Sequence, residues 1–321
     1  MASITSPLKP AALEPGDTIA VISPASPMLA ERLDKGIKYL RNSGYEVLLG
    51  SSVSKTYGYL AGRDHERLND LHAMFTNPEV KAIFSSRGGY GTPRLLDSLD
   101  YDHILKNPKI FMGYSDLTAI HLAIWKHTGL VTFSGPMVAV EMAEGIESIT
   151  EEFMWPVLCS DNFDGNFPLI QDSPLEVIVP GKSRGTLLGG CLSLVASILG
   201  TPHQPDFENA ILILEEIGEE PYRIDRNLSQ MSSCGILEKL NGIIIGQFLD
   251  CNAEEGKPTL TIKEILSDYF GSLSIPVAGN FMYGHGAKKF TIPIGVEVEI
   301  DTSIPQISLC ESGVKKRKMR S

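Results

Sequence analysis

Cysteine is scarce in this 321-residue sequence: five residues, odd in number and without close pairs. A disulfide framework and a CxxC metal site are therefore both unsupported, and a reducing compartment is expected. The sequence also lacks a basic N-terminal stretch followed by an apolar core. No apolar run approaches the roughly 18 residues that span a bilayer. We therefore expect a cytoplasmic protein without a membrane segment.

Basic residues are in deficit, since 28 lysines and arginines face 39 aspartates and glutamates, which leaves a formal net charge of −11. Nucleic acids and anionic membrane surfaces bind proteins through concentrated positive patches. The one dense basic run, residues 315–318, lies near the C-terminus, where a solvated tail is the ordinary role. We therefore predict neither nucleic acid nor membrane among the partners.

Short apolar runs alternate with amphipathic stretches through the first half of the chain. This alternation is typical of an α/β fold, in which helices join the strands of a parallel sheet and cover both of its faces. The expected strands are Thr18–Ile22, Glu46–Leu49, Ala82–Ser85 and Lys109–Met112, and the expected helices cover about 29–42, 63–75 and 116–127.

The character of the sequence changes near residues 160–185, where two turn-rich segments bracket weak strand material. We therefore predict an N-terminal domain over residues 1–165, a linker over 166–185 and a C-terminal domain over 186–321. The second domain is expected to be mixed α/β with a small sheet or barrel. Its predicted elements are a loop entering a buried helix over 187–200, apolar strands over 210–214 and 242–246, and β-structure over 289–301 and 306–309.

The first candidate for chemistry is Ser115, which follows an apolar strand and a glycine and precedes an expected helix. A serine at such a turn presents its hydroxyl at the carboxyl edge of the sheet, and N–H groups at the helix start suit a developing oxyanion. The α/β-hydrolase elbow has glycine two residues after its serine, where this chain has Leu117. A helix-capping serine is the alternative, and the local sequence leaves both open.

A glycine-rich segment, Arg87–Gly91, follows another expected strand. Its three glycines in four residues permit positive φ and a close approach of the main chain to a ligand. Neither GxGxxG nor GxxxxGK[ST] is present, so a nucleotide-binding loop is not indicated. Loops that leave neighbouring strands at one edge converge there. This segment is a candidate for a second oxyanion donor, with a tight structural turn as the alternative.

Two carboxylates, Glu215 and Glu216, end an apolar strand and point to opposite faces of it. Glu215 lies at the buried end, where a carboxylate can orient a histidine as the third member of a catalytic triad does. The alternative is an ordinary strand-end charge that pairs with Arg223 or Arg226.

Of the seven histidines, His285 stands apart because glycines flank it on both sides, on a constrained loop. It is the histidine best suited to act as a base near neutral pH. The sequence contains no HExxH motif, no cluster of cysteines and histidines and no EF-hand loop. We therefore predict no metal and no other cofactor.

Taken together, these segments resemble the serine LD-carboxypeptidase family, whose best-known members are the muramoyl-tetrapeptide carboxypeptidases and the microcin C self-immunity peptidases. The resemblance runs through nearly the whole chain, and the order and spacing of the segments make it specific. The matching segments are Gly16–Ala25, Arg87–Gly91, Gly113–Asp116, Gly189–Pro202, Leu214–Glu216, Pro221–Arg226 and Gly284–Gly286.

The resemblance implies roles for individual residues: Ser115 as the nucleophile, His285 as the base and Glu215 as the orienting carboxylate. It also implies an oxyanion pocket formed by main-chain amides near Gly89 and at Asp116. The implied fold is a Rossmann-like N-terminal domain with a parallel sheet, which carries the serine. A smaller β-rich C-terminal domain carries the glutamate and the histidine. Members of the family are commonly homodimers, so a homodimer is expected.

The implied function is a serine carboxypeptidase that hydrolyses the L,D bond before a C-terminal D-alanine in murein tetrapeptides, through an acyl-enzyme, during peptidoglycan recycling. The implied partner is a small peptide or muropeptide. One alternative is a microcin-immunity-like peptidase acting on peptidyl- or aminoacyl-nucleotides, although no tryptophan follows Trp155 to hold a nucleotide. A second alternative is a non-catalytic protein that binds small molecules. One departure from the family pattern is Cys191, which stands where asparagine is expected.

Overall fold

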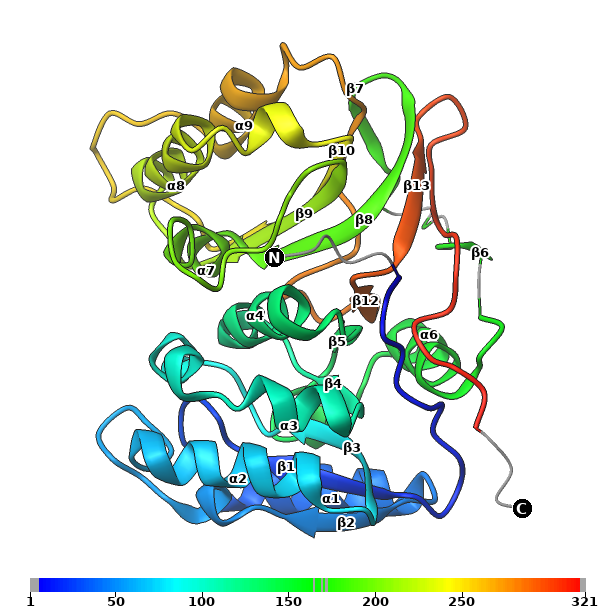
Figure 1. The fold of residues 1–321 in the computed structure, drawn as a ribbon. Helices are drawn as coiled ribbons and strands as arrows, with labels where there is room; N and C mark the ends of the chain where they lie inside the picture. The colour runs from blue at the N-terminus through cyan, green and yellow to red at the C-terminus, as the bar shows by residue number, and fades with distance from the viewer. Residues whose placement is uncertain (1–5, 164, 169, 171–172, 318–321) are drawn as a thin grey trace. The chain divides into compact units, whose positions relative to one another are not determined.

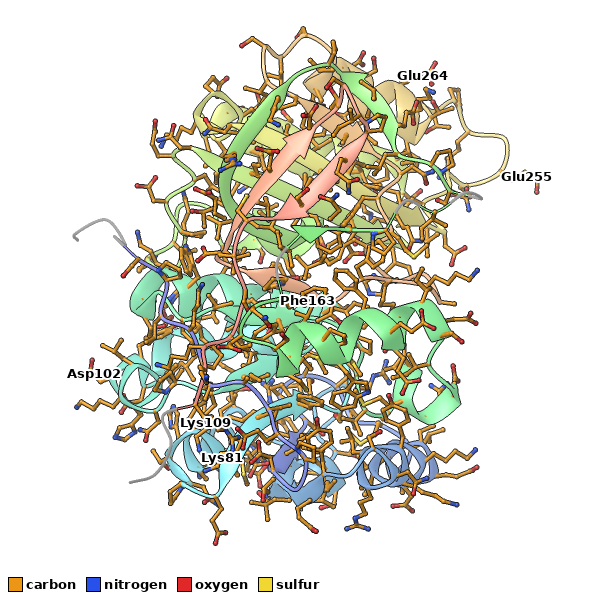
Figure 2. The ribbon with its side chains drawn as sticks, turned by 90° about the vertical axis from the view of Figure 1, so that its right-hand side faces the viewer. Lys81, Asp102, Lys109, Phe163, Glu255 and Glu264 are labelled. Atoms are coloured by element: carbon orange, nitrogen blue, oxygen red, sulfur yellow. The ribbon has the colours of Figure 1, made fainter. Side chains whose placement is uncertain are left out.

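A computed structural model of the protein describes residues 6–163, 165–168, 170 and 173–317. Contacts divide the chain into two compact units. The first holds the chain up to Phe163, labelled in Figure 2, together with Phe290–Gly295 and the residues from Ser312 onward. The second holds the residues between Phe163 and Phe290, together with Val296–Glu311. The chain therefore leaves the first unit and returns to it twice.

The first unit is built on a six-stranded sheet with the strand order β12-β5-β4-β3-β1-β2. Its five strands from the N-terminal half are parallel, and β12 pairs with β5 in the antiparallel direction. The parallel sheet predicted for the first half is confirmed. The strands are β1 (Thr18–Ile22), β2 (Glu46–Leu49), β3 (Val80–Ser85), β4 (Ile110–Met112), β5 (Thr132–Ser134) and β12 (Ile292–Ile294).

Helices connect these strands, and α1 shows why they form. Its buried residues Leu33, Ile37 and Leu40 recur at spacings of three and four, so one side of the helix faces the core. Helices α2, α3 and α4 pack in a row, and α1 packs against α5. The helices are α1 (Ala30–Asn42), α2 (Asp64–Thr76), α3 (Tyr101–Lys106), α4 (Thr118–Thr128), α5 (Glu141–Glu144) and α6 (Ser148–Cys159), with 3₁₀ turns η1 (Ser51–Ser54), η2 (Thr92–Ser98) and η3 (Ser115–Leu117).

The strand order creates a switch point between β1 and β3. The chain moves outward from β1 to β2 and then returns to β3 on the other side of β1 (Figure 1). Because both crossovers are expected to be right-handed, α1 and α2 cover opposite faces of the sheet. The loops that follow β1 and β3 therefore diverge at the carboxyl edge, which is where open α/β sheets usually bind ligands.

The opposite, amino edge of this sheet carries a buried cation, Lys109, next to Lys81 of β3 (Figure 2). The Lys109 ammonium donates a hydrogen bond to the main-chain carbonyl of Asn77. Burial, and then the neighbouring charge of Lys81, lower the pKa of Lys109 to about 8. A charged side chain is thus held where its ionised form is disfavoured.

The second unit contains an eight-stranded sheet with the order β6-β14-β13-β8-β9-β10-β11-β7. Its central strands β8, β9, β10 and β11 are parallel, and the flanking strands are antiparallel to their neighbours. The β-rich character predicted for this part is confirmed. The strands are β6 (Gly165–Asn166), β7 (Glu176–Val179), β8 (Lys182–Cys191), β9 (Ala210–Ile217), β10 (Gly242–Leu249), β11 (Val277–Gly279), β13 (Glu297–Asp301) and β14 (Gln306–Leu309).

In the second unit α7, α8 and α9 pack in a row, with α7 against β8 and β9 and α9 against β7 (Figure 1). Among the described helices of the chain, none combines the length and the apolar character that crossing a bilayer requires. The helices of this unit are α7 (Leu192–Ser197), α8 (Pro221–Ser233) and α9 (Ile262–Phe270), with a 3₁₀ turn η4 (Leu237–Lys239).

The structure differs from the sequence-based expectations in three places. The segment over 187–200 was expected to begin as a loop that enters a buried helix, but its first residues, 187–191, form the buried end of β8. Residues 166–185, expected as a linker, contain β7 and the start of β8. Within the segment 186–321, expected as the second domain, residues 290–295 and 312–317 are grouped with the first unit. The reason is strand pairing of β12 with β5 and hydrogen bonds of Lys315 to the N-terminal segment.

Candidate active site

Ser115 occupies a strained turn between β4 and α4 (Gly113–Leu117), which we call the nucleophile turn after the role expected of its serine. Its φ of 66° lies in the left-handed region, which costs a non-glycine residue on the order of 1–3 kcal/mol. Tyr114 before it is extended, and Leu117 after it is helical. This geometry lifts a serine hydroxyl off the carboxyl edge of a sheet, as in known nucleophile elbows.

The glycine-rich loop (Arg87–Gly91) lies directly against this serine. A Cβ atom at Gly88 would come within 2.8 Å of the Ser115 Cβ and 3.0 Å of its Oγ, so the close approach requires glycine. Gly89 has a φ of 108°, and a Cβ there would meet the Oγ of Ser26 at 2.3 Å. The Ser26 N–H donates to the Gly88 carbonyl at 3.2 Å. The loops after β1, β3 and β4 therefore touch at the carboxyl edge.

Asp116, the residue after the serine, contributes a buried carboxyl as well as its main-chain amide. Only 1% of the residue is exposed, and Oδ2 accepts a hydrogen bond from the N–H of Thr92 at 2.8 Å. Burial raises the pKa of Asp116 to about 6, and hydrogen bonds from Thr92 and the main chain of Gly91 oppose this rise. The sequence singled out this residue for its amide alone.

In the second unit, Glu215 of β9 pairs with His285. The His285 Nδ1 lies 2.7 Å from the Glu215 Oε2, and Glu215 is 1% exposed. Because a carboxylate only accepts hydrogen bonds, the proton sits on Nδ1, which leaves Nε2 as the basic nitrogen. Burial raises the pKa of Glu215, and the bond to His285 opposes that rise. This is the pairing of base and orienting acid found in catalytic triads.

The loop that carries this histidine, the histidine loop (Tyr283–Gly286), is held by the end of β10. The N–H of Gly286 donates to the Oε1 of Gln247 at 2.9 Å, and the Gln247 N–H donates to the Tyr283 carbonyl at 2.8 Å. A Cβ at Gly284, whose φ is 125°, would lie 2.8 Å from the Glu215 Oε2. Sequence reasoning missed Gln247, because only the position at a strand end marks it.

Glu216, the other carboxylate of the doublet, is engaged elsewhere. Its Oε2 accepts the Ser193 N–H at 2.8 Å, and its Oε1 accepts the Cys191 thiol at 3.2 Å. Burial raises the pKa of Cys191 well above its usual range. Of the two arginines suggested as partners for Glu215, Arg223 instead forms ion pairs with Glu219 and Glu220, and Arg226 lies over the ring of Tyr222 at 5.2 Å.

A second residue that sequence reasoning passed over is His121 of α4, which is fully buried beneath the nucleophile turn. Its Nε2 lies 2.7 Å from the Gly113 carbonyl, which only accepts, so Nε2 carries the proton. Burial lowers the pKa of His121 to about 4, so the ring is neutral at neutral pH. Its helical spacing resembles that of an ordinary core residue, and only the packed structure reveals the contact with the turn.

Two family models match this chain. One, described as the LD-carboxypeptidase N-terminal domain, matches residues 19–135, and the other, the LD-carboxypeptidase C-terminal domain, matches residues 184–300. Ser115 and Asp116 lie in the first match, and Glu215 and His285 lie in the second. Together the two models cover most of the chain.

Individual proteins are similar over nearly their whole length. The probable murein peptide carboxypeptidase of Bacillus subtilis is 40% identical over 98% of this chain and 97% of its own length. Microcin C7 self-immunity protein MccF of Escherichia coli is 30% identical over 97% and 98%. MccF solved in complex with glutamyl sulfamoyl guanosine has a TM-score of 0.89 at 28% identity, over 96% of this chain and 100% of that one. Muramoyltetrapeptide carboxypeptidase from Oxalobacter formigenes has a TM-score of 0.82 at 33% identity, over 94% and 100%.

Proposed function

The chain belongs to the LD-carboxypeptidase family of serine-type hydrolases, and we propose that it hydrolyses the L,D bond before a C-terminal D-alanine in murein tetrapeptides. The names of the B. subtilis and O. formigenes proteins support this substrate class. The observation that carries the proposal is the 2.7 Å contact between Glu215 and His285, because a carboxylate-oriented histidine is the base that a serine nucleophile requires.

The first half of the proposed reaction forms an acyl-enzyme. The Nε2 of His285 takes the proton of the Ser115 hydroxyl as the serine Oγ attacks the carbonyl carbon that precedes D-alanine. Glu215 holds the ring in the required tautomer and stabilises its positive charge. The C–N bond then breaks, and D-alanine departs with the proton from His285. Water hydrolyses the resulting ester by the same steps, which frees Ser115.

Negative charge develops on the carbonyl oxygen during each attack. We assign its stabilisation to main-chain N–H groups at Gly89 and at Asp116. Support comes from the contact between Gly88 and Ser115 and from the positive φ of Gly89, since glycine gives the main chain room to approach a reacting atom. Removing one donor of this kind typically lowers kcat by about 10²–10³-fold.

The test is mass-spectrometric detection of D-alanine released from a disaccharide tetrapeptide, with wild type and Ser115→Ala measured in parallel. We expect release by wild type and a loss of about 10⁴-fold or more in the variant, by analogy with measured triads. Thermal unfolding of both proteins serves as the control for folding. Equal release by the two proteins would exclude Ser115 as the nucleophile.

A second candidate substrate is a peptidyl- or aminoacyl-nucleotide. The similarity to MccF solved with glutamyl sulfamoyl guanosine favours it. The same serine mechanism would apply, with a different leaving group. A panel that contains the tetrapeptide and an aminoacyl sulfamoyl nucleoside separates the two, since the preferred class is the one with the higher kcat/KM.

We place this activity in the cytoplasm, in the recycling of peptidoglycan fragments, and we expect a homodimer. Scattered cysteines without close pairs support the compartment. Light scattering on the purified protein tests the dimer, and a monomer at micromolar concentration would exclude it.

A further inference from the structure

We propose that Thr92 and the side chain of Asp116 are positioning residues, which form a clasp that holds the glycine-rich loop at a set distance from Ser115. This inference rests on the proposed function, because the clasp acts through the main-chain amides assigned to the oxyanion. It assigns a role to the side chains of Thr92 and Asp116, whereas the proposed mechanism uses only the main-chain amide of Asp116 and gives Thr92 no role.

The clasp consists of two hydrogen bonds between the same two residues, and Thr92 is the donor in both. The main-chain N–H of Thr92 donates to the carboxylate of Asp116 at 2.8 Å, and the Thr92 hydroxyl donates to the main-chain carbonyl of Asp116. Each side chain thus grips the other residue's main chain. Both residues are buried, with exposures of 0% and 1%, so water does not compete for these bonds.

The clasp joins two loops that are both next to Ser115. Asp116 directly follows Ser115, and Thr92 directly follows the glycine-rich loop, whose Gly88 touches Ser115. The two hydrogen bonds therefore join the two loops that supply the nucleophile and the oxyanion donors. A displacement of reacting groups by about 1 Å can lower a rate about 100-fold, so a fixed spacing between these loops matters for catalysis.

A buried arginine anchors the same end of the loop from α2. The Arg67 Nη1 donates to the Gly91 carbonyl at 3.0 Å and also to the carbonyl of Pro24 in the loop after β1. The other terminal nitrogen of the guanidinium, Nη2, forms an ion pair with Asp64 at 2.6 Å. Arg67 is fully buried, and its positive charge lowers the pKa of Asp116. The clasp therefore fixes the loop to the nucleophile turn, and Arg67 fixes it to the rest of the unit.

The ionisation of Asp116 points to function more than to stability. Burial raises its pKa to about 6, so the ionised form present at neutral pH is disfavoured by its surroundings. A neutral acceptor would cap the Thr92 N–H at a lower cost in folding free energy. Charged acceptors make shorter and stronger hydrogen bonds, which suits a clasp that must keep a loop rigid. Sites that trade stability for a fixed geometry are typical of active centres.

The first test removes one half of the clasp with Thr92→Val, which keeps the shape and deletes the hydroxyl. The readouts are the rate at which a fluorophosphonate probe labels Ser115, and kcat and KM for D-alanine release. We expect the labelling rate and kcat to fall by about 10–100-fold with KM changed by less than about twofold, because the clasp acts on the oxyanion donors and not on substrate binding. Thr92→Ser restores the hydroxyl and is expected to restore both rates.

A matched control is Thr132→Val. Thr132 of β5 is also fully buried, but its hydroxyl has no hydrogen-bond partner in the described part of the chain, so its removal is expected to leave both rates unchanged. The clasp is excluded if the Thr92→Val variant is labelled and releases D-alanine at the wild-type rates. It is also excluded if Thr92→Ser fails to restore these two rates. A loss seen only in thermal stability would also exclude it.

A double-mutant cycle provides the sharper result. Asp116→Ala removes the carboxylate and keeps the amide, so the Thr92→Val/Asp116→Ala protein should lose far less than the product of the two single losses. Full additivity would contradict a shared clasp. Wild type that is labelled but releases no D-alanine overturns the proposed substrate alone, since labelling still measures the clasp. Wild type that cannot be labelled overturns both the oxyanion assignment and the clasp.

Discussion

The nucleophile turn of the first unit and the histidine loop of the second hold their polar groups by different means. In the turn the main chain dominates: Ser115 is in the left-handed region, and the carboxyl of Asp116 reaches a main-chain N–H. In the histidine loop two side chains form the central contact, between His285 and Glu215, and a third, Gln247, holds the loop from β10. The turn should therefore respond to changes in loop geometry, and the histidine loop to the loss of individual side chains.

The largest expected effect comes from removing the side chain of His285 from the histidine loop. His285→Ala should lower kcat/KM for D-alanine release by about 10⁴-fold or more, because it removes the base. Glu215→Gln should cost roughly one to two orders of magnitude less, because this residue orients the base and exchanges no proton with substrate. The matched control is His103→Ala at an exposed histidine of α3, with activity expected within about twofold of wild type. Equal losses for the Glu215 and His285 variants would contradict the division of roles.

A smaller effect is expected from Gln247→Leu, which removes the acceptor of the Gly286 N–H. Because both residues are only partly buried, losing this hydrogen bond should lower the free energy of unfolding in urea by about 0.5–1.5 kcal/mol. The histidine becomes less well oriented, so kcat should fall about tenfold. Gln247→Glu keeps an acceptor at this position and is the matched control. A Leu variant with unchanged kcat would show that Glu215 alone orients the histidine.

The smallest effects concern stability against pH in the first unit, where Asp116 and Lys109 lie at opposite edges of the sheet. The pKa of Asp116 is raised to about 6 from 3.8, so the stability it contributes is present below about pH 4 and lost as pH rises through about 6. The pKa of Lys109 is lowered to about 8 from 10.5, so wild type gains stability as pH rises from about 8 to about 10.5.

The two contributions can be measured separately by comparing the melting temperature of wild type with those of Asp116→Asn and Lys109→Met between about pH 4 and pH 10.5. Wild type should lose stability relative to the Asn variant between about pH 4 and 6, and gain relative to the Met variant above about pH 8. The Met variant should keep its activity, because Lys109 lies at the amino edge, away from the nucleophile turn. Parallel melting curves for wild type and Asp116→Asn would mean that the carboxyl titrates normally.

Much of the first unit follows from local patterns in the sequence. The strands predicted at 18–22 and 46–49 have the observed bounds, and the helix predicted from about residue 29 begins at Ala30. Apolar residues at regular spacing are enough here, since each element buries one face or both against its neighbours. The same signals were weaker in the second unit, where strands are flanked by glycine and turn residues.

Residues 187–191, which were expected to belong to a loop, show why local signals are weaker in the second unit. Gly189 and Gly190 suggest a loop, yet both lie in β8, between β9 and β13. A Cβ at Gly189 would lie 2.0 Å from the carbonyl oxygen of Ile213, so the glycine is there to let two main chains approach. Strand propensity cannot reveal this, because the requirement comes from a neighbouring strand and not from the segment itself.

The sequence by itself determined the parallel α/β sheet, the strand-to-helix turn at Ser115 and the short list of residues able to carry chemistry. The tertiary structure decided which residues meet: His285 pairs with Glu215 across 70 positions of sequence, and Asp116 pairs across 24 positions with Thr92, which the sequence analysis had not singled out. It also brought β12 back to the first unit. Local periodicity depends on near neighbours and can be read from a window of residues. Contacts between distant segments depend on how whole elements pack, and no window contains them.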